Sequence, residues 1–358
     1  MVQVGVDPVS QQETSQNAMT KQIASRPYIQ AWLFCICALI FIMVIVGGAT
    51  RLTGSGLSIT EWKPIMGAIP PMSLDDWHEA FEKYKQIPQY KEINAGMSLE
   101  EFKGIFWWEW GHRFLGRFIG VAFLLPFLFF LFTKRVEPSL KPKLWFLFAL
   151  GGLQGFLGWY MVASGLVERT DVSQYRLAMH LGLAVVIYGA IFWVALGLGK
   201  KQEKGTASKS LNWQAWGLTG LIFLQIIAGA FVAGLKAGKA YNTWPLMDGR
   251  FIPNDLFIMQ PAWQNLFENV RTVQFDHRML AYVIAFGVIA HLIYCLLKHD
   301  PRVVKGAGVL TVLTGAQIFL GIITLLQFVP LDLALAHQGG ALVLLSGALW
   351  HCKRLSWT

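Results

Sequence analysis

Long runs of apolar residues, separated by short polar segments, fill most of the chain. A helix needs about 20 apolar residues to cross the hydrocarbon core of a bilayer, and eight stretches are of about this length. They are Gln30–Ala49, Arg113–Thr133, Leu144–Val167, Leu177–Gly199, Trp213–Leu235, Met279–Leu297, Val303–Leu326 and Leu331–Cys352. The pattern predicts an all-α integral membrane protein with eight transmembrane helices.

Basic residues are concentrated in alternate loops between these predicted helices. The formal net charge is +9, and most of the surplus lies in three loops and after the last helix. The positive-inside rule assigns these segments to the cytoplasm, together with the N-terminal segment. The residues are Lys21, Arg26, Lys134, Arg135, Lys141, Lys143, Lys200, Lys201, Lys204, Lys209, Lys298, Arg302, Lys305, Lys353 and Arg354. The charge therefore indicates orientation in a lipid bilayer, with both termini cytoplasmic, and not a nucleic-acid partner.

Residues 1–28 are polar and lack the apolar core of a signal peptide, so we expect a disordered cytoplasmic tail there. The cysteines, Cys35, Cys37, Cys295 and Cys352, fall within predicted helices or near the cytoplasmic face. No disulfide is therefore expected in an outer loop.

The two halves of the chain repeat one order of motifs. Gln154–Gly158 matches Gln317–Gly321, and His180–Ala184 resembles His337–Ala341. Each half has an even number of helices, so the halves share an orientation and would be related by an axis along the membrane normal. We predict two pseudo-twofold-related four-helix bundles. The N-terminal bundle covers residues 29–199 with a long outer loop at 50–111, a cytoplasmic linker covers 200–210, and the C-terminal bundle covers 211–358.

Four histidines hold repeating positions at the outer ends of predicted helices. His112 and His180 belong to the first half, and His277 and His337 occupy the matching places in the second. A histidine inside a membrane span is costly unless its nitrogen is used. Facing helices of a bundle can hold a flat metal cofactor between two such residues, so the pattern predicts two haem-type sites near the outer surface. For any one histidine, the alternative is an ordinary hydrogen-bonded residue at a helix end.

Several arginines could pair with the two propionates of a haem, because guanidinium groups suit carboxylates. Arg113 and Arg278 each follow a histidine directly, Arg176 lies near the start of its helix and Arg51 ends the first helix. Ordinary interfacial arginines are the alternative interpretation. Arg117 lies deeper in its helix, where an arginine is usually functional or paired.

The two halves differ in one charged position. Glu109 precedes His112 on the same helical face, whereas the matching residue in the second half is the neutral Gln274. An acid beside a metal site can move protons or stabilise developing positive charge. We infer chemistry in the first half and a permanent redox cofactor in the second; the alternative is that Glu109 only caps its helix or pairs with Arg113.

The long outer loop of the first half contains two helix starts. Ser73 with Asp76, and Ser98 with Glu101, resemble capping boxes. Each start is followed by an apolar stripe, which would let a short helix lie over the first site. The stripes are Trp77, Phe81 and Tyr84, and Phe102, Ile105 and Phe106. Trp107, Trp108 and Trp110 are typical of an interfacial aromatic belt, with direct stacking on a ring as the alternative.

Five motifs together resemble the haem A synthases, in the subgroup shared by proteobacteria and mitochondria. They are Gly47–Ser58, Glu61–Pro64, Phe106–Arg113, Tyr241–Gly249 and Asn269–Arg278. The resemblance covers nearly the whole chain beyond the tail. Another bacterial subgroup has paired cysteines in its outer loops, and this chain has none, so no mechanism requiring an outer disulfide can be carried over.

The resemblance implies that a methyl group of haem O is oxidised to a formyl group, giving haem A for terminal oxidases. It implies a haem b cofactor held by His277 and His337, with Arg278 nearby. It further implies that His112 and His180 face the iron of the haem O substrate, with Glu109 as the essential acid. Arg113 and Arg117 are the expected substrate-binding arginines. The expected location is a bacterial inner membrane with the haem sites on the periplasmic side; haem O synthase, oxidase assembly factors and a second copy of the chain are candidate partners.

Two other functions remain open from the sequence. A b-type cytochrome that only transfers electrons is favoured by His291 and His351, which lie about four turns beyond His277 and His337 and could hold a further haem on the inner side. Neither has a counterpart in the first half, where Pro126 matches His291. A transporter would also have parallel repeats, but it predicts broken helices and polar clusters at mid-membrane.

Overall fold

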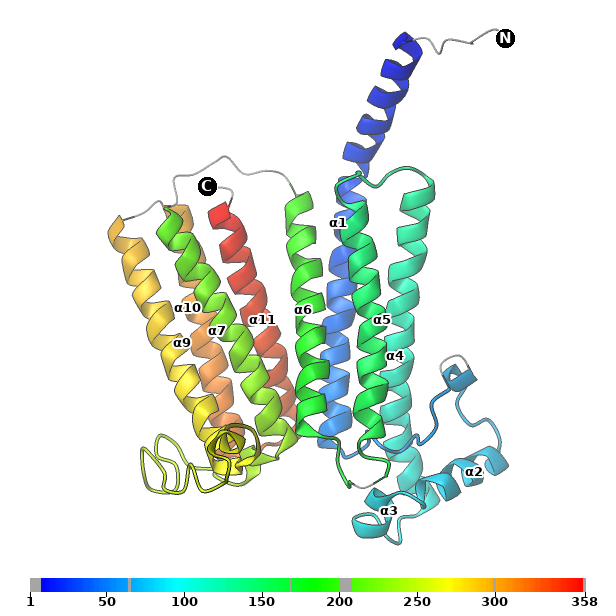
Figure 1. Ribbon diagram of the computed structural model, residues 1–358, viewed down its shortest axis with the longest axis vertical. Helices are drawn as coiled ribbons and strands as arrows, with labels where there is room; N and C mark the ends of the chain where they lie inside the picture. Colours follow the sequence, from blue (N-terminus) through cyan, green and yellow to red (C-terminus); the bar gives the residue numbers. More distant parts are fainter. Residues whose placement is uncertain (1–7, 64–65, 168, 200–207, 299–300, 357–358) are drawn as a thin grey trace.

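The computed structural model describes residues 8–63, 66–167, 169–199, 208–298 and 301–356. Within these ranges the structure is helical and contains no β-strand. Eight helices are long and apolar enough to cross a membrane (Figure 1). They are α1 (Pro8–Leu52), α4 (Leu99–Phe132), α5 (Lys141–Ala163), α6 (Gln174–Leu198), α7 (Lys209–Gly234), α9 (Val270–Lys298), α10 (Pro301–Leu326) and α11 (Leu331–Ser356). The predicted fold class, an all-α integral membrane protein with eight spans, is confirmed.

The first helix begins much earlier than the apolar pattern indicated. It starts at Pro8, and its first turns extend beyond the other helices (Figure 1). Residues 9–26 contain neither glycine nor proline, and the helix continues through Pro27 into the membrane span. The expectation of a disordered tail is therefore wrong for residues 8–28, and residues 1–7 lie outside the described part of the chain.

The outer loop of the first half folds as predicted at its helix starts. Ser73 caps α2 (Leu74–Tyr84) and Ser98 caps α4, each in a reciprocal capping box with Asp76 and Glu101 respectively. The second start does not open a separate short helix, because α4 runs without a break from Leu99 into the membrane. The shorter helix α3 (Pro88–Glu92) lies between α2 and α4.

The membrane helices pack in two groups of four. In the first, α1 contacts α4 and α6, and α5 closes the group by contacting α4 and α6; in the second, α7, α9, α10 and α11 make the corresponding contacts. Helices α6 and α7, α1 and α11, and α6 and α11 join the groups. Equivalent residues of the two halves also make equivalent contacts across this junction. Gly182 of α6 faces Ile227 of α7, and the matching Gly339 of α11 faces Ile45 of α1. This is what a twofold relation would give, and the relation itself stays a prediction.

Polar contacts also fasten the two groups together. The side-chain amide of Gln338 on α11 donates to the Val44 carbonyl of α1 at 2.9 Å, and the hydroxyls of Tyr188 and Ser346 lie 2.8 Å apart. Gly48 of α1 lies against Gln338, where an added Cβ would come within 2.1 Å of the amide oxygen. One buried apolar cluster runs through both groups.

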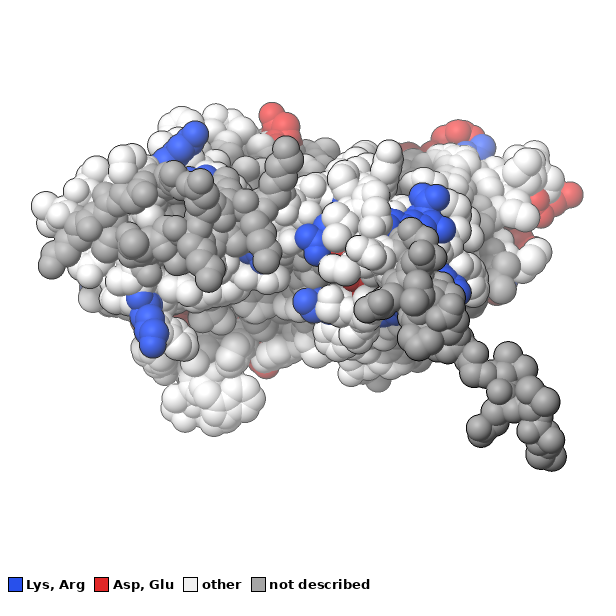
Figure 2. Space-filling view, turned by 90° about the horizontal axis from the view of Figure 1, so that it is seen from above, with Lys and Arg blue, Asp and Glu red and all other residues white. Residues whose placement is uncertain are grey.

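The two ends of the molecule differ in character. Both ends of the chain lie on one side, and α2 and α3 lie on the other (Figure 1). Figure 2, which looks onto the end with the termini, shows lysine and arginine groups across it and acidic groups mainly at its margin. Of the predicted linker 200–210, residues 200–207 lie outside the described residues; α7 begins at Lys209.

Candidate functional site

The four predicted histidines lie towards the end of the molecule opposite the termini. His112 is on α4 and His180 on α6, while His277 is on α9 and His337 on α11. All four residues are partly exposed, and the two members of each pair lie in the same group of four helices. The structure therefore places each predicted pair in one helix group, and the binding of the pairs to iron stays a prediction.

Three of these histidines are bonded by a glutamine from the membrane helix before them. The pairs, with the distance from the amide nitrogen to Nδ1, are Gln154 with His180 at 3.2 Å, Gln225 with His277 at 3.2 Å and Gln317 with His337 at 3.1 Å. In the same order, each amide also donates to the main-chain carbonyl of its histidine at 3.0, 2.9 and 2.8 Å. One amide group thus holds both the ring and the backbone of each histidine.

A glycine one turn after each glutamine lets the helix approach the ring. A Cβ added at Gly158, Gly229 or Gly321 would lie 3.1, 3.2 or 2.9 Å from Cε1 of the histidine it faces. These distances are short for a carbon contact, so any larger residue would push the ring away. The glycines therefore fix how closely ring and helix can pack.

His112 is the exception. Gly47 on α1 faces its ring in the same way, at 3.2 Å from an added Cβ to Nε2. One turn earlier, however, α1 carries Met43, and the Met43 methyl lies against Gly116 of α4. Among the described residues, no side chain forms a hydrogen bond with the His112 ring.

Glu109 lies one turn before His112 and is only 2% exposed. Its Oε2 accepts hydrogen bonds from the Ser58 hydroxyl and the Ile59 backbone N–H, both at 2.7 Å. Its Oε1 accepts from Arg113, at 2.6 Å from Nη2 and 3.1 Å from Nε. The pairing with Arg113 that the sequence left open is therefore present. Every contact is a donor, so the surroundings suit a negative charge.

Gln274 occupies the matching place in the second half and is equally buried. Its amide nitrogen donates to the carbonyls of Ala237 and Tyr241 at 3.1 and 2.9 Å, and its oxygen accepts from Arg278 at 3.3 Å. Arg278 also donates to the Tyr241 and Thr243 carbonyls, as Arg113 does to those of Ile59 and Glu61. Both halves therefore fasten an outer loop to the histidine helix, one through a carboxylate and the other through a neutral amide.

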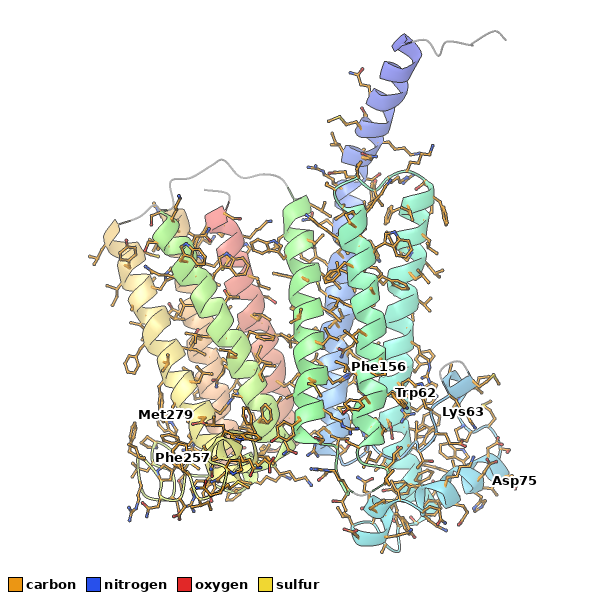
Figure 3. The ribbon with its side chains drawn as sticks, in the orientation of Figure 1. Trp62, Lys63, Asp75, Phe156, Phe257 and Met279 are labelled. Atoms are coloured by element: carbon orange, nitrogen blue, oxygen red, sulfur yellow. The ribbon has the colours of Figure 1, made fainter. Side chains whose placement is uncertain are left out.

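Arg117 bonds to the same outer segment. Its Nη2 donates to the Lys63 carbonyl at 3.0 Å, and Trp62 and Lys63 lie beside the outer part of α4 (Figure 3). Tyr282, the matching residue in the second half, accepts a hydrogen bond from the Trp244 indole at 3.1 Å. In this structure Arg117 supports the loop over the first site, and its contact with substrate stays a prediction.

The other two candidate arginines are bonded to protein groups. Arg51 pairs with Asp171 at 3.2 Å. Arg176 donates to the Tyr160 carbonyl at 2.7 Å, and its guanidinium lies 3.8 Å from the centre of the Tyr160 ring. These contacts match the ordinary interfacial role that the sequence left open.

The outer loop of the first half has its own apolar core. The predicted stripe residues Trp77, Phe81, Tyr84, Phe102 and Phe106 are buried in it, and Ile105 packs against them. The first half thus carries a folded unit in its outer loop. Trp107 and Trp108 are 46% and 43% exposed, as expected for an interfacial belt, although Trp107 also packs on Trp77.

The surface of this folded unit carries an ion-pair group. Hydrogen bonds from Lys63 and Lys83 lower the pKa of Glu61 below its usual value.

The inner histidines form a closed pair. His291 and His351 are 3% and 0% exposed, and their Nε2 atoms lie 2.9 Å apart. Gln214 lies 3.0 Å from the other nitrogen of His291. Because the two Nε2 atoms lie at hydrogen-bond distance and both rings are buried, the structure leaves no room for an iron between these two nitrogens. The structure therefore disfavours a further haem at this end.

The sequence interpretation missed the three glutamines and Ser58. Gln154 and Gln317 lie in the repeated motifs, and Gln225 has the same spacing to Gly229. That spacing was the available signal, because a residue one turn from a helix-facing glycine lies on the same face. The Ser58 contact depends on how the loop folds back onto α4, and no local pattern shows that.

The residues at both outer sites fit a haem. Each site offers two imidazoles that would hold the iron, and glycines open the helix surface beside them. An iron-bound imidazole keeps a proton on Nδ1 and needs an acceptor for it. The buried amide oxygens of Gln154, Gln225 and Gln317 have no hydrogen-bond partner, so a turned amide would supply that acceptor.

These features define a helical membrane protein with two histidine pairs at one end, each pair suited to hold a haem. The chain belongs to the family described as cytochrome oxidase assembly protein, which it matches over residues 30–349. The resemblance to haem A synthases found in the sequence motifs is confirmed by the similarity to full-length relatives.

The relatives include three proteins named "Heme A synthase". One from Parvibaculum lavamentivorans is 55% identical over 342 residues, covering 95% of this chain and 98% of that protein. One from Nitrosospira multiformis is 52% identical over 338 residues, covering 92% and 94%. One from Rhodopseudomonas palustris is 53% identical over 320 residues, covering 89% and 86%.

Proposed function

We propose that the chain acts as a haem A synthase, an oxidoreductase that converts a methyl group of haem O into the formyl group of haem A. Relatives of that name are more than 50% identical and align over nearly the whole length. The two outer histidine pairs supply the haem sites that such a reaction needs. The product would serve terminal oxidases, in agreement with the family description.

The second half is the proposed site of the resident haem b, with His277 and His337 as ligands to its iron and Arg278 nearby. Bound haem b would supply a centre that accepts and passes on single electrons. Gln225 and Gln317 bond to the two imidazoles, so both ligands are held in place by their neighbours. That arrangement suits a cofactor that stays bound.

The first half is the proposed substrate site, with His112 and His180 facing the iron of haem O. Arg113 and Arg117 lie on the same helix as His112 and fasten the overlying segment. They would position substrate by holding this cover and by offering positive charge to its propionates.

Glu109 is the proposed essential acidic residue, acting as a carboxylate, and its difference from Gln274 is the observation that carries the proposal. Gln274 shows that fastening a loop at this position needs no charge. The first half nevertheless places a buried carboxylate there and surrounds it with donors. A fixed negative charge beside the substrate can stabilise positive charge that develops as electrons leave the methyl carbon, and can take up its protons.

The proposed location is a bacterial inner membrane, with both termini in the cytoplasm and the haem sites towards the periplasm. The basic end of the molecule supports this orientation (Figure 2). The haem O synthase that supplies the substrate, and factors that assemble the oxidase, are proposed partners. A homo-oligomer is a further proposal.

A b-type cytochrome is the second candidate function. The closed inner pair of His291 and His351 weakens it, because the dihaem arrangement was its main support. The uninterrupted membrane helices likewise give no support to a transporter.

The deciding experiment is pigment analysis of cells that lack their own haem A synthase and express this chain with a haem O synthase. Extracted haems would be separated by chromatography, with haem O synthase alone as the control. We expect haem A only when the chain is present. Haem O without haem A, in cells where the chain accumulates and binds haem b, would instead establish an electron carrier.

A further inference from the structure

The outer histidines differ in what holds them, and the difference falls on one position. His180, His277 and His337 each have a glutamine amide on the ring and on the backbone. His112 has Gly47 in the expected place but no such amide. Three of the four ligand positions are therefore built alike, and the fourth departs from the plan.

The residue that replaces the glutamine is Met43. The sequence Leu39–Phe41 on α1 repeats as Leu221–Phe223 on α7, which aligns Met43 with Gln225 and Gly47 with Gly229. The helix therefore keeps the glycine that faces the histidine and loses only the amide. A methionine at this place has almost the volume of glutamine, but its thioether is at most a weak acceptor and donates nothing.

The loss of this amide has a physical consequence for His112. An amide that bonds to the ring and to the histidine carbonyl limits rotation of the imidazole, so the ring stays oriented towards its iron. Residues that orient a metal-binding histidine in this way typically contribute about 10- to 100-fold to metal affinity. Without such a partner, the His112 ring can turn away at little cost.

We propose that Met43 makes His112 the exchangeable ligand of the first-half site. Haem would enter and leave this site when the His112 ring turns away from the iron. This rests on the proposed function, because a substrate haem must come and go while the cofactor haem stays. His180, held by Gln154, would keep the substrate oriented from the other side. Met43 is thus a positioning residue: because it cannot bond to the His112 ring, it leaves the orientation of that ring less restricted.

The test measures haem release and not activity. Protein produced together with a haem O synthase is purified, and an excess of apomyoglobin is added as haem acceptor. The haem O and haem b that remain on the protein are then quantified over time. We expect M43Q to release haem O about 10-fold more slowly than the unchanged chain, with haem b retention unaltered.

Two matched variants complete the design. M43L keeps an apolar side chain and should release haem O as fast as the unchanged chain. Q225M removes the amide from the cofactor site and should hasten haem b release about 10-fold. If M43Q does not accumulate, Q154M and Q225M test whether the glutamine amide slows haem release. Q154M should hasten release of haem O from the first half, and Q225M should hasten release of haem b from the second.

The outcomes separate the two proposals. M43Q protein that binds haem O and releases it at the original rate would overturn the role of Met43 and leave the proposed function standing. Q225M and Q154M variants that both retain haem normally would overturn it as well. An unchanged chain that never carries haem O, even when haem O is abundant, would reject the substrate site itself and this inference with it.

Discussion

The outer ends of the two halves share one framework and differ in a few side chains. Both present two histidines, glycines behind the rings and an arginine that fastens a loop. The first half adds the buried charge of Glu109, the anchor-free His112 and a folded cover; the second has neutral Gln274 and amides on both histidines. The comparison teaches that two repeats of one framework can place the same histidines in different surroundings, which is the basis for proposing a substrate site in one half and a cofactor site in the other.

The largest expected effect comes from removing ligands of either half. We expect His277→Ala and His337→Ala to abolish the low-spin haem b spectrum of the purified protein, because one imidazole cannot replace the bis-histidine pair. His112→Ala should keep that spectrum and lose haem A formation. An oxidised spectrum unchanged in the two second-half variants would reject the division between cofactor and substrate sites.

A smaller but still large effect should follow from exchanging the charged position. Glu109→Gln is expected to keep haem b and to lower haem A formation about 100-fold or more, the range usual for loss of an acid–base group. Gln274→Glu is the matched variant: its carboxylate would face the carbonyls of Ala237 and Tyr241, so it should lower protein accumulation. Both quantities are read from haem extracts of the same membranes. Normal haem A output from Glu109→Gln would remove Glu109 from the mechanism.

The smallest effect should come from the partner of that carboxylate. Ser58→Ala removes one of the two hydrogen bonds to Oε2, and Ala240 already stands at the matching position in the second half. A hydrogen bond to a charged group is worth about 1.5–3 kcal/mol, and because the Ile59 N–H still bonds to Oε2 we expect a loss at the low end of this range, about 10-fold in haem A formation, with haem b content unchanged. A loss as complete as that of Glu109→Gln would show that Ser58 does more than hold the carboxylate.

Much of the fold could be predicted from the sequence because the bilayer imposes a simple length rule. The eight spans follow from runs of apolar residues, and the caps at Ser73 and Ser98 follow from local residue types. The extent of α1 and the continuity of α4 did not follow. Polar residues such as those at 9–26 show no apolar pattern, yet they continue a helix already nucleated in the membrane.

The site was predicted in part. The pairing of histidines and the contrast of Glu109 with Gln274 came from the repeat, since matching positions reveal differences without any structure. The contacts of Arg51 and Arg176 could not be predicted, because their partners Asp171 and Tyr160 are brought near only by the packing of loops and helices. The three glutamines could have been singled out by their shared spacing to a glycine, but their contacts with the histidines depend on how neighbouring helices pack, which this spacing does not give.

Through the contact between Gly48 and Gln338, α1 packs against residues of both histidine sites. Gly47 touches the His112 ring on one side, and the next residue touches the neighbour of His337 on the other. Neither half is therefore a self-sufficient module: cutting the chain after α6 would strip the C-terminal piece of the carbonyl that receives the Gln338 amide. The junction is therefore part of both histidine sites, and a side chain added at Gly48 would displace Gln338 directly beside His337.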